Sequence, residues 1–206
     1  MNYLFTRYTS PRTLAKRLKR QQGEHRWEAA ANLSKGRADV LSVDSLEALA
    51  GFLETVTQKQ AIGVGVIRDG RTTAPVALKA TIEEGTAPAG AIARSVDDLG
   101  MPSRGLLFID VDDGQEPQAI IDHLTAFDES MKGVKWLALG SSRYHVTDKT
   151  GRTVTQKSGW HLYALAEGLE HLNAYAKAYE AWAREAGYAK QVADDAGRKR
   201  WVYPID

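Results

Sequence analysis

The feature that most constrains this chain is an apolar run that ends in two alternating acids, LLFIDVD at residues 106–112. Apolar and β-branched residues in this pattern predict a buried strand. Residues i and i+2 of a strand share a face about 6.6 Å apart, so Asp110 and Asp112 are expected side by side. Such close like charges repel, and a divalent cation bound by carboxylate oxygens would compensate. A strand that ends in a solvated acidic turn is an equally open interpretation, because Asp113-Gly114 follows.

The composition predicts a globular protein with one sizeable core or two small lobes, since 206 residues are 43% hydrophobic and 26% charged. No apolar run approaches the eighteen residues that a membrane-spanning helix needs, and Tyr3-Leu4-Phe5 is too short for a signal peptide. The chain has no cysteine, which excludes disulfides, thiolate zinc sites and cysteine nucleophiles. We therefore expect a cytoplasmic protein without a membrane partner.

Positive charge is concentrated at the N-terminus although the net charge is only +1, with six basic residues and no acid between Met1 and Gly23. Ser10 as N-cap and Pro11 at the first helical position predict a helix that carries most of them. The expected nucleic-acid-binding residues are Arg12, Lys16, Arg17, Lys19 and Arg20. Such a cluster can engage phosphates, and the alternative is a solvated helix face.

Periodicity and turn signals predict an ordered series of further elements. They are a helix opened by Asp44-Ser45-Leu46-Glu47 that runs to about Thr57, a strand over 61–68 with a partner strand over 75–82, the strand at 106–112, a helix opened by Pro117, strands over 134–139 and 160–165, a helix over 169–186, and a strand over 200–205. From residue 105 the order is strand, helix, strand, strand, helix, strand. That order fits a small sheet with helices on one face, the ferredoxin-like or RRM-like plan, and an α+β class.

A second group of polar residues surrounds the strand over 160–165, in which His161 and Tyr163 share one face. Gly159 would let a ligand approach the backbone closely, and Lys157 would supply charge for a phosphate. Upstream, Ser141-Ser142-Arg143 offers hydroxyls, exposed amides and a guanidinium, which are the groups that a triphosphate needs. Taken alone, His161 is better interpreted as a hydrogen-bonded structural histidine, and that is the only role expected of His25, His123, His145 and His171.

Taken together, the Asp-x-Asp strand, the Ser-Ser strand end, Ser-Gly-x-His-Leu-Tyr and an Asp after an apolar strand resemble the archaeo-eukaryotic primase superfamily. The resemblance is to the primase-polymerase domains of phages and plasmids, and it covers roughly residues 101–206. It implies one catalytic domain over 1–206, with an RRM-like half at 101–206 packed with an N-terminal α/β half at 1–100.

Carried over residue by residue, the resemblance implies that Asp110, Asp112 and Asp206 hold Mg²⁺ or Mn²⁺ and that His161 contacts the incoming nucleotide. The other expected nucleotide-binding residues are Lys157, Ser141, Ser142 and Arg143. Asp194 and Asp195 compete with Asp206 for the place of the third acid, although they more resemble a solvated turn. Members of this family often continue into a helicase or an accessory helical domain, so a helicase is an expected partner.

The expected activity is template-directed nucleotidyl transfer from nucleoside triphosphates on single-stranded DNA, in the replication of a phage, plasmid or other mobile element. One alternative is a metal-dependent nuclease, which the absence of a His-x-His pair disfavours. The other is a non-catalytic RRM-like binder of single strands. Two aspartates stand where such a binder would carry surface aromatics, which disfavours this alternative.

Overall fold

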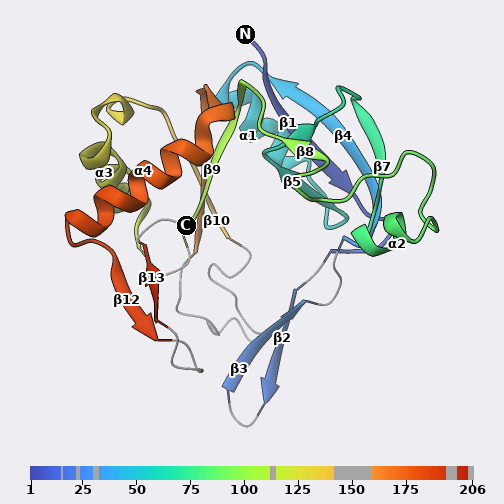
Figure 1. The fold of residues 1–206 in the computed structure, drawn as a ribbon, viewed down its shortest axis with the longest axis horizontal. Helices are drawn as coiled ribbons and strands as arrows, with labels where there is room; N and C mark the ends of the chain where they lie inside the picture. Colours follow the sequence, from blue (N-terminus) through green and yellow to red (C-terminus); the bar gives the residue numbers. More distant parts are fainter. Residues whose placement is uncertain are drawn as a thin grey trace. The chain divides into compact units, whose positions relative to one another are not determined.

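The computed structural model describes residues 1–14, 16–21, 24–29, 33–111, 115–141, 159–193 and 199–203. The chain divides into two compact units, Met1–Leu106 with Ala166–Glu170 and Leu107–Leu165 with His171–Asp206. In both, helices accompany mostly antiparallel strands, which is compatible with the predicted α+β class (Figure 1). The division of one domain into halves at residues 100 and 101 stays a prediction.

The first unit is built on a sheet around β1. Its elements are β1 (Tyr3–Thr9), β4 (Lys35–Val43), α1 (Leu46–Glu54), β5 (Gln60–Gly63), β6 (Val66–Ile67), β7 (Thr73–Ala77), α2 (Lys79–Glu83), β8 (Leu99–Gly100) and the start of β9 (Arg104–Val111). β1 pairs antiparallel with β4 and β5, and β4 pairs antiparallel with β7. A parallel bridge between Leu4 and Gly105 joins β1 to β9. β6 and β8 form a separate short pair.

Alternation along β1 supplies hydrophobic residues to both faces of this sheet. On one face Tyr8 joins a buried cluster with Ala38, Ala74 and Ile67. On the other, the rings of Phe5 and Phe52 meet edge to face with centroids 5.1 Å apart, which anchors α1. The sheet of the first unit is therefore covered by apolar side chains on each side.

The predicted basic helix after Ser10 is wrong, because β2 (Lys16–Gln21) and β3 (Glu24–Ala29) pair as antiparallel strands. The hydroxyl of Ser10 accepts a hydrogen bond from the Arg12 backbone N–H in a short turn instead of capping a helix. The backbone N–H of Leu14 donates to the carbonyl of Gln58, at 2.7 Å. Bonds to a distant part of the chain thus replace the local bonds that a helix would need.

Several other boundaries differ from the sequence-based expectations. The N-cap of α1 is Ser45, whose hydroxyl accepts from the Ala48 N–H at 3.1 Å, so Glu47 is not at the capping-box position. The single strand expected over 61–68 is two strands, β5 and β6. The strand expected over 75–82 is shorter, pairs with β4 as β7, and gives way to α2.

The second unit contains the remainder of β9 and the elements that follow it. They are α3 (Pro117–Phe127), β10 (Leu137–Gly140), β11 (Trp160–Glu167), α4 (Leu172–Glu185), β12 (Lys190–Ala193) and β13 (Lys199–Val202), with a 3₁₀ turn at Glu129–Met131. Its sheet has the order β10-β11-β9, and β10 and β11 are antiparallel with Leu139 opposite His161. Pro117 begins α3, as expected from its fixed φ and missing N–H.

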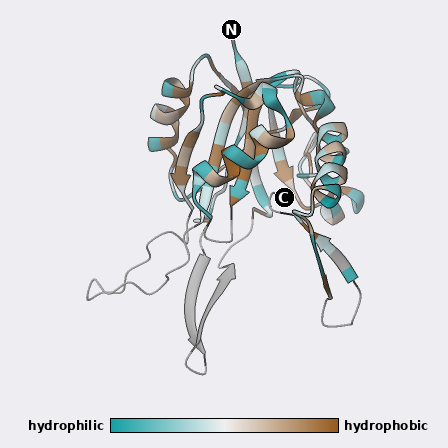
Figure 2. Ribbon diagram, turned by 90° about the vertical axis from the view of Figure 1, so that its left-hand side faces the viewer, coloured by the Kyte–Doolittle hydropathy of each residue, from teal (hydrophilic) through white to brown (hydrophobic). Residues whose placement is uncertain are grey.

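The core of the second unit lies between this sheet and α3, where Ile109, Val111 and Leu162 of the strands meet Ile120 and Leu124 of the helix. Figure 2 shows both hydrophobic and hydrophilic residues along the helices, as expected of helices with one buried face. Aromatic rings connect α3 and α4, including those of His123 and Tyr179 with centroids 5.7 Å apart.

The strand expected over 200–205 is present as β13, but it pairs with β12, an element that was not expected. In the described chain, β13 is therefore outside the sheet that contains β9. None of the described helices is long and apolar enough to cross a bilayer.

Candidate functional site

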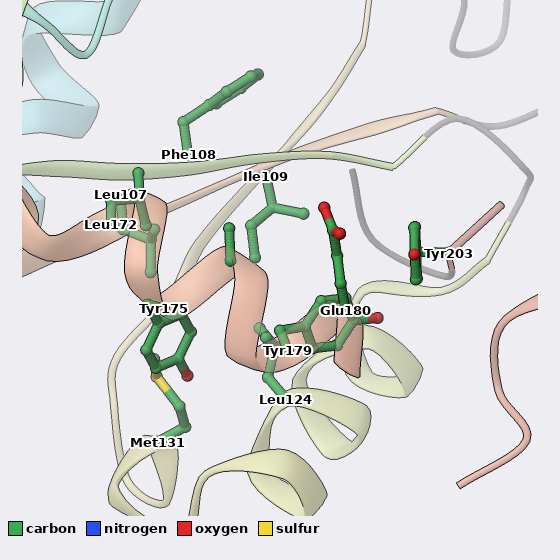
Figure 3. Close-up of a pocket in the computed structure, with 11 residues that line it drawn as sticks. Leu107, Phe108, Ile109, Leu124, Met131, Leu172, Tyr175, Tyr179, Glu180 and Tyr203 are labelled. Atoms are coloured by element: carbon green, nitrogen blue, oxygen red, sulfur yellow. The ribbon is translucent and has the colours of Figure 1, made fainter. Parts of the chain in front are cut away.

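Alternation along β9 separates a core face from an open face. Ile109 and Val111 are buried against α3, whereas Phe108 and Asp110 are exposed. Figure 3 shows Phe108 and Ile109 on opposite sides of the β9 ribbon. Asp110 therefore belongs to the face of the sheet that the α3 core does not use.

His161 of β11 lies on the same face as Asp110, with its Nε2 atom 3.5 Å from the Oδ1 atom of that carboxylate. The side chains are 33% and 50% exposed, so solutes can reach both. A separation of 3.5 Å is longer than a strong hydrogen bond and makes an ion pair only when the imidazole is protonated. The structure thus brings together a predicted catalytic acid and the predicted nucleotide-binding histidine.

Aromatic rings surround His161 on this face. The Phe108 ring centroid lies 5.3 Å from that of His161 and 5.2 Å from that of Tyr163. Burial, together with the negative charge of Asp110, raises the pKa of the Tyr163 hydroxyl, which therefore stays neutral at physiological pH. Phe108 was missed from the sequence, although its position two residues before Asp110 already placed it on the face of that acid.

The end of β9, the end of β10 and the start of β11 meet beside this pair. The Ser141 backbone N–H donates to the Gly159 carbonyl at 2.8 Å. A Cβ atom built on buried Gly159 would lie 2.5 Å from the Ser141 Oγ and 3.3 Å from the Val111 carbonyl oxygen. Gly159 is therefore needed for the close packing of the three strand ends.

This junction corrects two expectations. The space over Gly159 is occupied by the protein's own Ser141 and Val111, so Gly159 does not open the backbone to a ligand. The backbone amide of Ser141 is already donated within the sheet, so it is not a donor for a phosphate. The Ser141 hydroxyl remains a candidate nucleotide contact.

The remaining predicted site residues fall into two groups. Seven of them lie outside the described residues: Asp112, Ser142, Arg143, Lys157, Asp206 and the competing Asp194 and Asp195. Lys16, Arg17, Lys19 and Arg20 lie in β2, where the backbone and the strand register are described, and exposed Arg12 precedes that strand. Within the described ranges, no three Asp, Glu or His side chains gather as a metal site. Of the three predicted metal ligands, the structure therefore describes Asp110 alone.

A hollow of about 310 Å³ lies on the helix side of β9 (Figure 3). Its lining is mainly apolar and includes Leu107, Ile109, Leu124, Met131, Leu172, Ala176, Tyr175, Tyr179, Tyr203, Glu180 and Phe108. The Glu180 carboxylate lies 3.4 Å from the Arg184 guanidinium. Leu107 and Ile109 alternate with Asp110 along β9, so these two lining residues lie on the opposite face of the strand from the Asp110 carboxylate. Phe108, which also lines the hollow, shares the face of Asp110.

The first unit contains a charged cluster around the buried carboxylate of Asp39. Its carboxylate accepts hydrogen bonds from Arg37 Nε at 2.6 Å, Arg7 at 3.1 Å and the Thr73 hydroxyl at 3.1 Å. Burial alone would favour protonation, but these three donors outweigh it and hold the pKa of Asp39 below its ordinary value. The cluster has its own internal partners across β1, β4 and β7, which is typical of a structural network.

No protein-family model matches the chain, and no curated protein or solved structure matches it. Function is therefore inferred from the residues and their geometry.

Proposed function

We propose that the chain is a template-directed nucleotidyltransferase of the primase-polymerase kind that uses Mg²⁺ or Mn²⁺. The observation that supports this best is the pair of Asp110 and His161, on neighbouring strands of one sheet face with 3.5 Å between Oδ1 and Nε2. A carboxylate for a cation and an imidazole for a phosphate stand next to one another there. That is the combination needed to hold the triphosphate of an incoming nucleotide.

The donor chemistry of the site fits a hard divalent cation. Asp110 is half exposed at the end of a strand, and Asp112 follows two residues later in the sequence. Carboxylate oxygens are the ligands that Mg²⁺ and Mn²⁺ prefer, and Asp206 is the proposed third acid. When bound, the metal would neutralise charge on the phosphate oxygens.

The proposed reaction forms a bond between a 3′-hydroxyl oxygen and the α-phosphorus, breaks the bond from that phosphorus to pyrophosphate, and releases the hydroxyl proton to solvent. His161 donates a hydrogen bond to the triphosphate, with Lys157, Ser142 and Arg143 as further expected contacts. Phe108 and Tyr163 pack on the imidazole and restrict its orientation. Catalysis of this type rests on positioning and charge stabilisation.

The arrangement of the second unit supports an RRM-like catalytic half. The RRM-like plan begins with the chain order strand, helix, strand, strand, helix, which is the order of β9, α3, β10, β11 and α4. The spatial order β10-β11-β9 also agrees with the first three strands of that plan. The fourth strand departs from the plan, because β13 pairs with β12. The proposal therefore relies on three strands and the site that two of them carry.

A second candidate function is a non-catalytic binder of single strands. Phe108 lies on β9, and His161 and Tyr163 lie on neighbouring β11, with ring centroids 5.2 to 6.4 Å apart. Rings on two central strands of a sheet are the usual base-stacking platform of RRM-like modules. The sequence alone disfavoured such a binder, whereas these neighbouring rings are an observation in its favour.

The deciding experiment measures labelled nucleotide incorporation on single-stranded DNA, with and without a primer, in Mg²⁺ or Mn²⁺. We expect Asp110→Asn to reduce incorporation by about 100-fold or more, as loss of a charge-stabilising group does. Asp122→Asn is the matched control, because Asp122 is an exposed carboxylate of α3 that bonds Gln118.

Three results would contradict the proposal. The first is unchanged incorporation in Asp110→Asn. The second is strand cleavage in place of incorporation, which would identify a nuclease. The third is chelator-resistant DNA binding without incorporation, lost in Phe108→Ala, which would identify the non-catalytic binder.

A further inference from the structure

The strand register of the hairpin formed by β2 and β3 separates its residues into two chemically different faces. Residues directly opposite one another in an antiparallel pair lie on the same face, and the faces alternate along each strand. Lys16 pairs with Ala29, Leu18 with Trp27 and Arg20 with His25, so these six residues share one face. Arg17 pairs with Glu28, Lys19 with Arg26 and Gln21 with Glu24 on the other. We call them the Trp27 face and the Arg17 face.

The Trp27 face carries two permanent cations and, among its six residues, no carboxylate. Its central pair, Leu18 and Trp27, stands between Lys16 and Arg20, which are about 13 Å apart along a strand of normal rise. The Arg17 face carries three cations and two carboxylates, and Arg17 stands opposite Glu28 in the register. By register and sequence, the net formal charge is therefore +2 on the Trp27 face (two cations, no carboxylate) and +1 on the Arg17 face (three cations, two carboxylates).

We infer that the Trp27 face of this hairpin is a docking surface for single-stranded DNA. Lys16 and Arg20 supply charge for the phosphates, and Trp27 supplies a surface on which an unpaired base stacks. The inference deepens the proposed function, on which it rests for the identity of the strand as the template. It also reassigns the basic residues, since Lys16 and Arg20 act together while Arg17 and Lys19 do not.

The central pair favours a single strand over a duplex. A two-stranded ribbon can enter the major groove of DNA, but it reads base edges with polar side chains that donate and accept hydrogen bonds. Leu18 and Trp27 at the centre of the face offer little of that capacity. Bases within a duplex are already stacked on each other, whereas those of a single strand are open to stack on an indole ring.

The test compares two double substitutions that remove the same charge from opposite faces of the hairpin. Lys16→Gln with Arg20→Gln neutralises the Trp27 face, and Arg17→Gln with Lys19→Gln neutralises the other. Affinity of the full chain for a labelled 20-nucleotide single strand is measured at several salt concentrations, with a chelator and without nucleotide. We expect the first pair to weaken binding and to flatten the log–log salt slope by about 1.4, and the second pair to change both far less.

Trp27 has its own variants in the same assay. Trp27→Ala should weaken single-strand binding by about 5-fold or more, and Trp27→Phe should keep most of the affinity because it retains a ring. If Trp27→Ala proves unfolded in a thermal melt, Trp27→Phe and the two charge pairs still decide the matter. Equal effects of the two charge pairs, or tighter wild-type binding to a duplex or to anionic vesicles than to the single strand, would overturn the inference.

The outcomes for the hairpin and for the catalytic proposal are separable. The hairpin variants are read out as binding without nucleotide, and Asp110→Asn is read out as incorporation. Face-selective loss of single-strand binding in a chain that incorporates no nucleotide would support the docking surface and reject the primase-polymerase. Normal nucleotide incorporation, together with equal effects of the two charge pairs on binding, would support the primase-polymerase and reject the docking surface.

Discussion

Replacing Gly159 by alanine tests whether the three strand ends beside the candidate site are as closely packed as the structure indicates. The new methyl group would lie 2.5 Å from the Ser141 Oγ, 3.3 Å from the Ser141 Cβ and 3.3 Å from the Val111 carbonyl oxygen. The hydroxyl contact is the severe one, because the two contacts at 3.3 Å need shifts of only a few tenths of an ångström. The perturbation therefore depends mainly on one atom of Ser141.

The magnitude follows from two opposing effects. Overpacking of a buried position costs about 1–3 kcal/mol of unfolding free energy. Replacing Gly by Ala also raises the free energy of unfolding by about 0.4–1 kcal/mol, because the unfolded chain has less conformational freedom. We expect Gly159→Ala to lower the free energy of unfolding by about 1–2 kcal/mol, balancing these two terms. In a Ser141→Ala background the severe contact is absent, so the same substitution should be nearly neutral.

The assay is a double-mutant cycle from urea unfolding curves of the wild type, Gly159→Ala, Ser141→Ala and the double variant. The coupling between the two positions should be about 1–2 kcal/mol, within the range found for residues in contact. A cost for Gly159→Ala that is the same in both backgrounds would refute the assignment of the contact to the hydroxyl. A neutral Gly159→Ala in the wild-type background would refute the close packing itself.

Three further predictions concern charge and the site. Asp39→Asn should lower the free energy of unfolding by about 2 kcal/mol at pH 7, because it removes the negative charge that pairs with Arg7 and Arg37 and replaces one of the two acceptor oxygens by a donor. The loss is limited because Arg37 is largely exposed. Because the pKa of Asp39 is held low in the folded protein, its stabilisation is present above about pH 4 and disappears as pH falls through the folded pKa. Urea unfolding curves at pH values from about 7 to about 2 would show this loss. Burial lowers the pKa of His123 in the folded protein, so the unfolded chain binds the proton first as pH falls. The free energy of unfolding of the wild type should therefore decrease below about pH 6.5, and His123→Phe should lack that decrease in the same unfolding assay. His161→Gln should raise the nucleotide KM with little change in the unfolding midpoint. Phe108→Ala should raise the KM more weakly, because the Phe108 ring only packs on the imidazole of His161.

Local signals in the sequence predicted the elements that have local causes. Pro117 marks the start of α3, and the alternation over 160–165 places His161 and Tyr163 on one face of β11. The run that ends in Asp110 is a strand, and Asp110 and His161 meet on its open face. In each case the information lies within a few residues of the feature itself.

The features that escaped prediction depend on partners far along the chain. Leu14 and Leu18 have helical spacing, but the register of β2 with β3 determines the structure there. Asp39 looks like an ordinary charged residue in sequence, and its partners Arg7 and Thr73 come from two other strands. The role of Gly159 depends in the same way on Val111, 48 positions earlier in the chain. Pairing between distant strands of this kind leaves little trace in any local window.

The hydrogen bond from the Ser141 N–H to the Gly159 carbonyl has a consequence for protein engineering. It closes the base of a 17-residue segment, 142–158, whose two ends are already held together by the β10–β11 ladder. Residues 141 and 159 are therefore fixed anchors, and a reporter peptide inserted between them, away from the proposed contacts Ser142, Arg143 and Lys157, should leave the β10–β11 pairing in place.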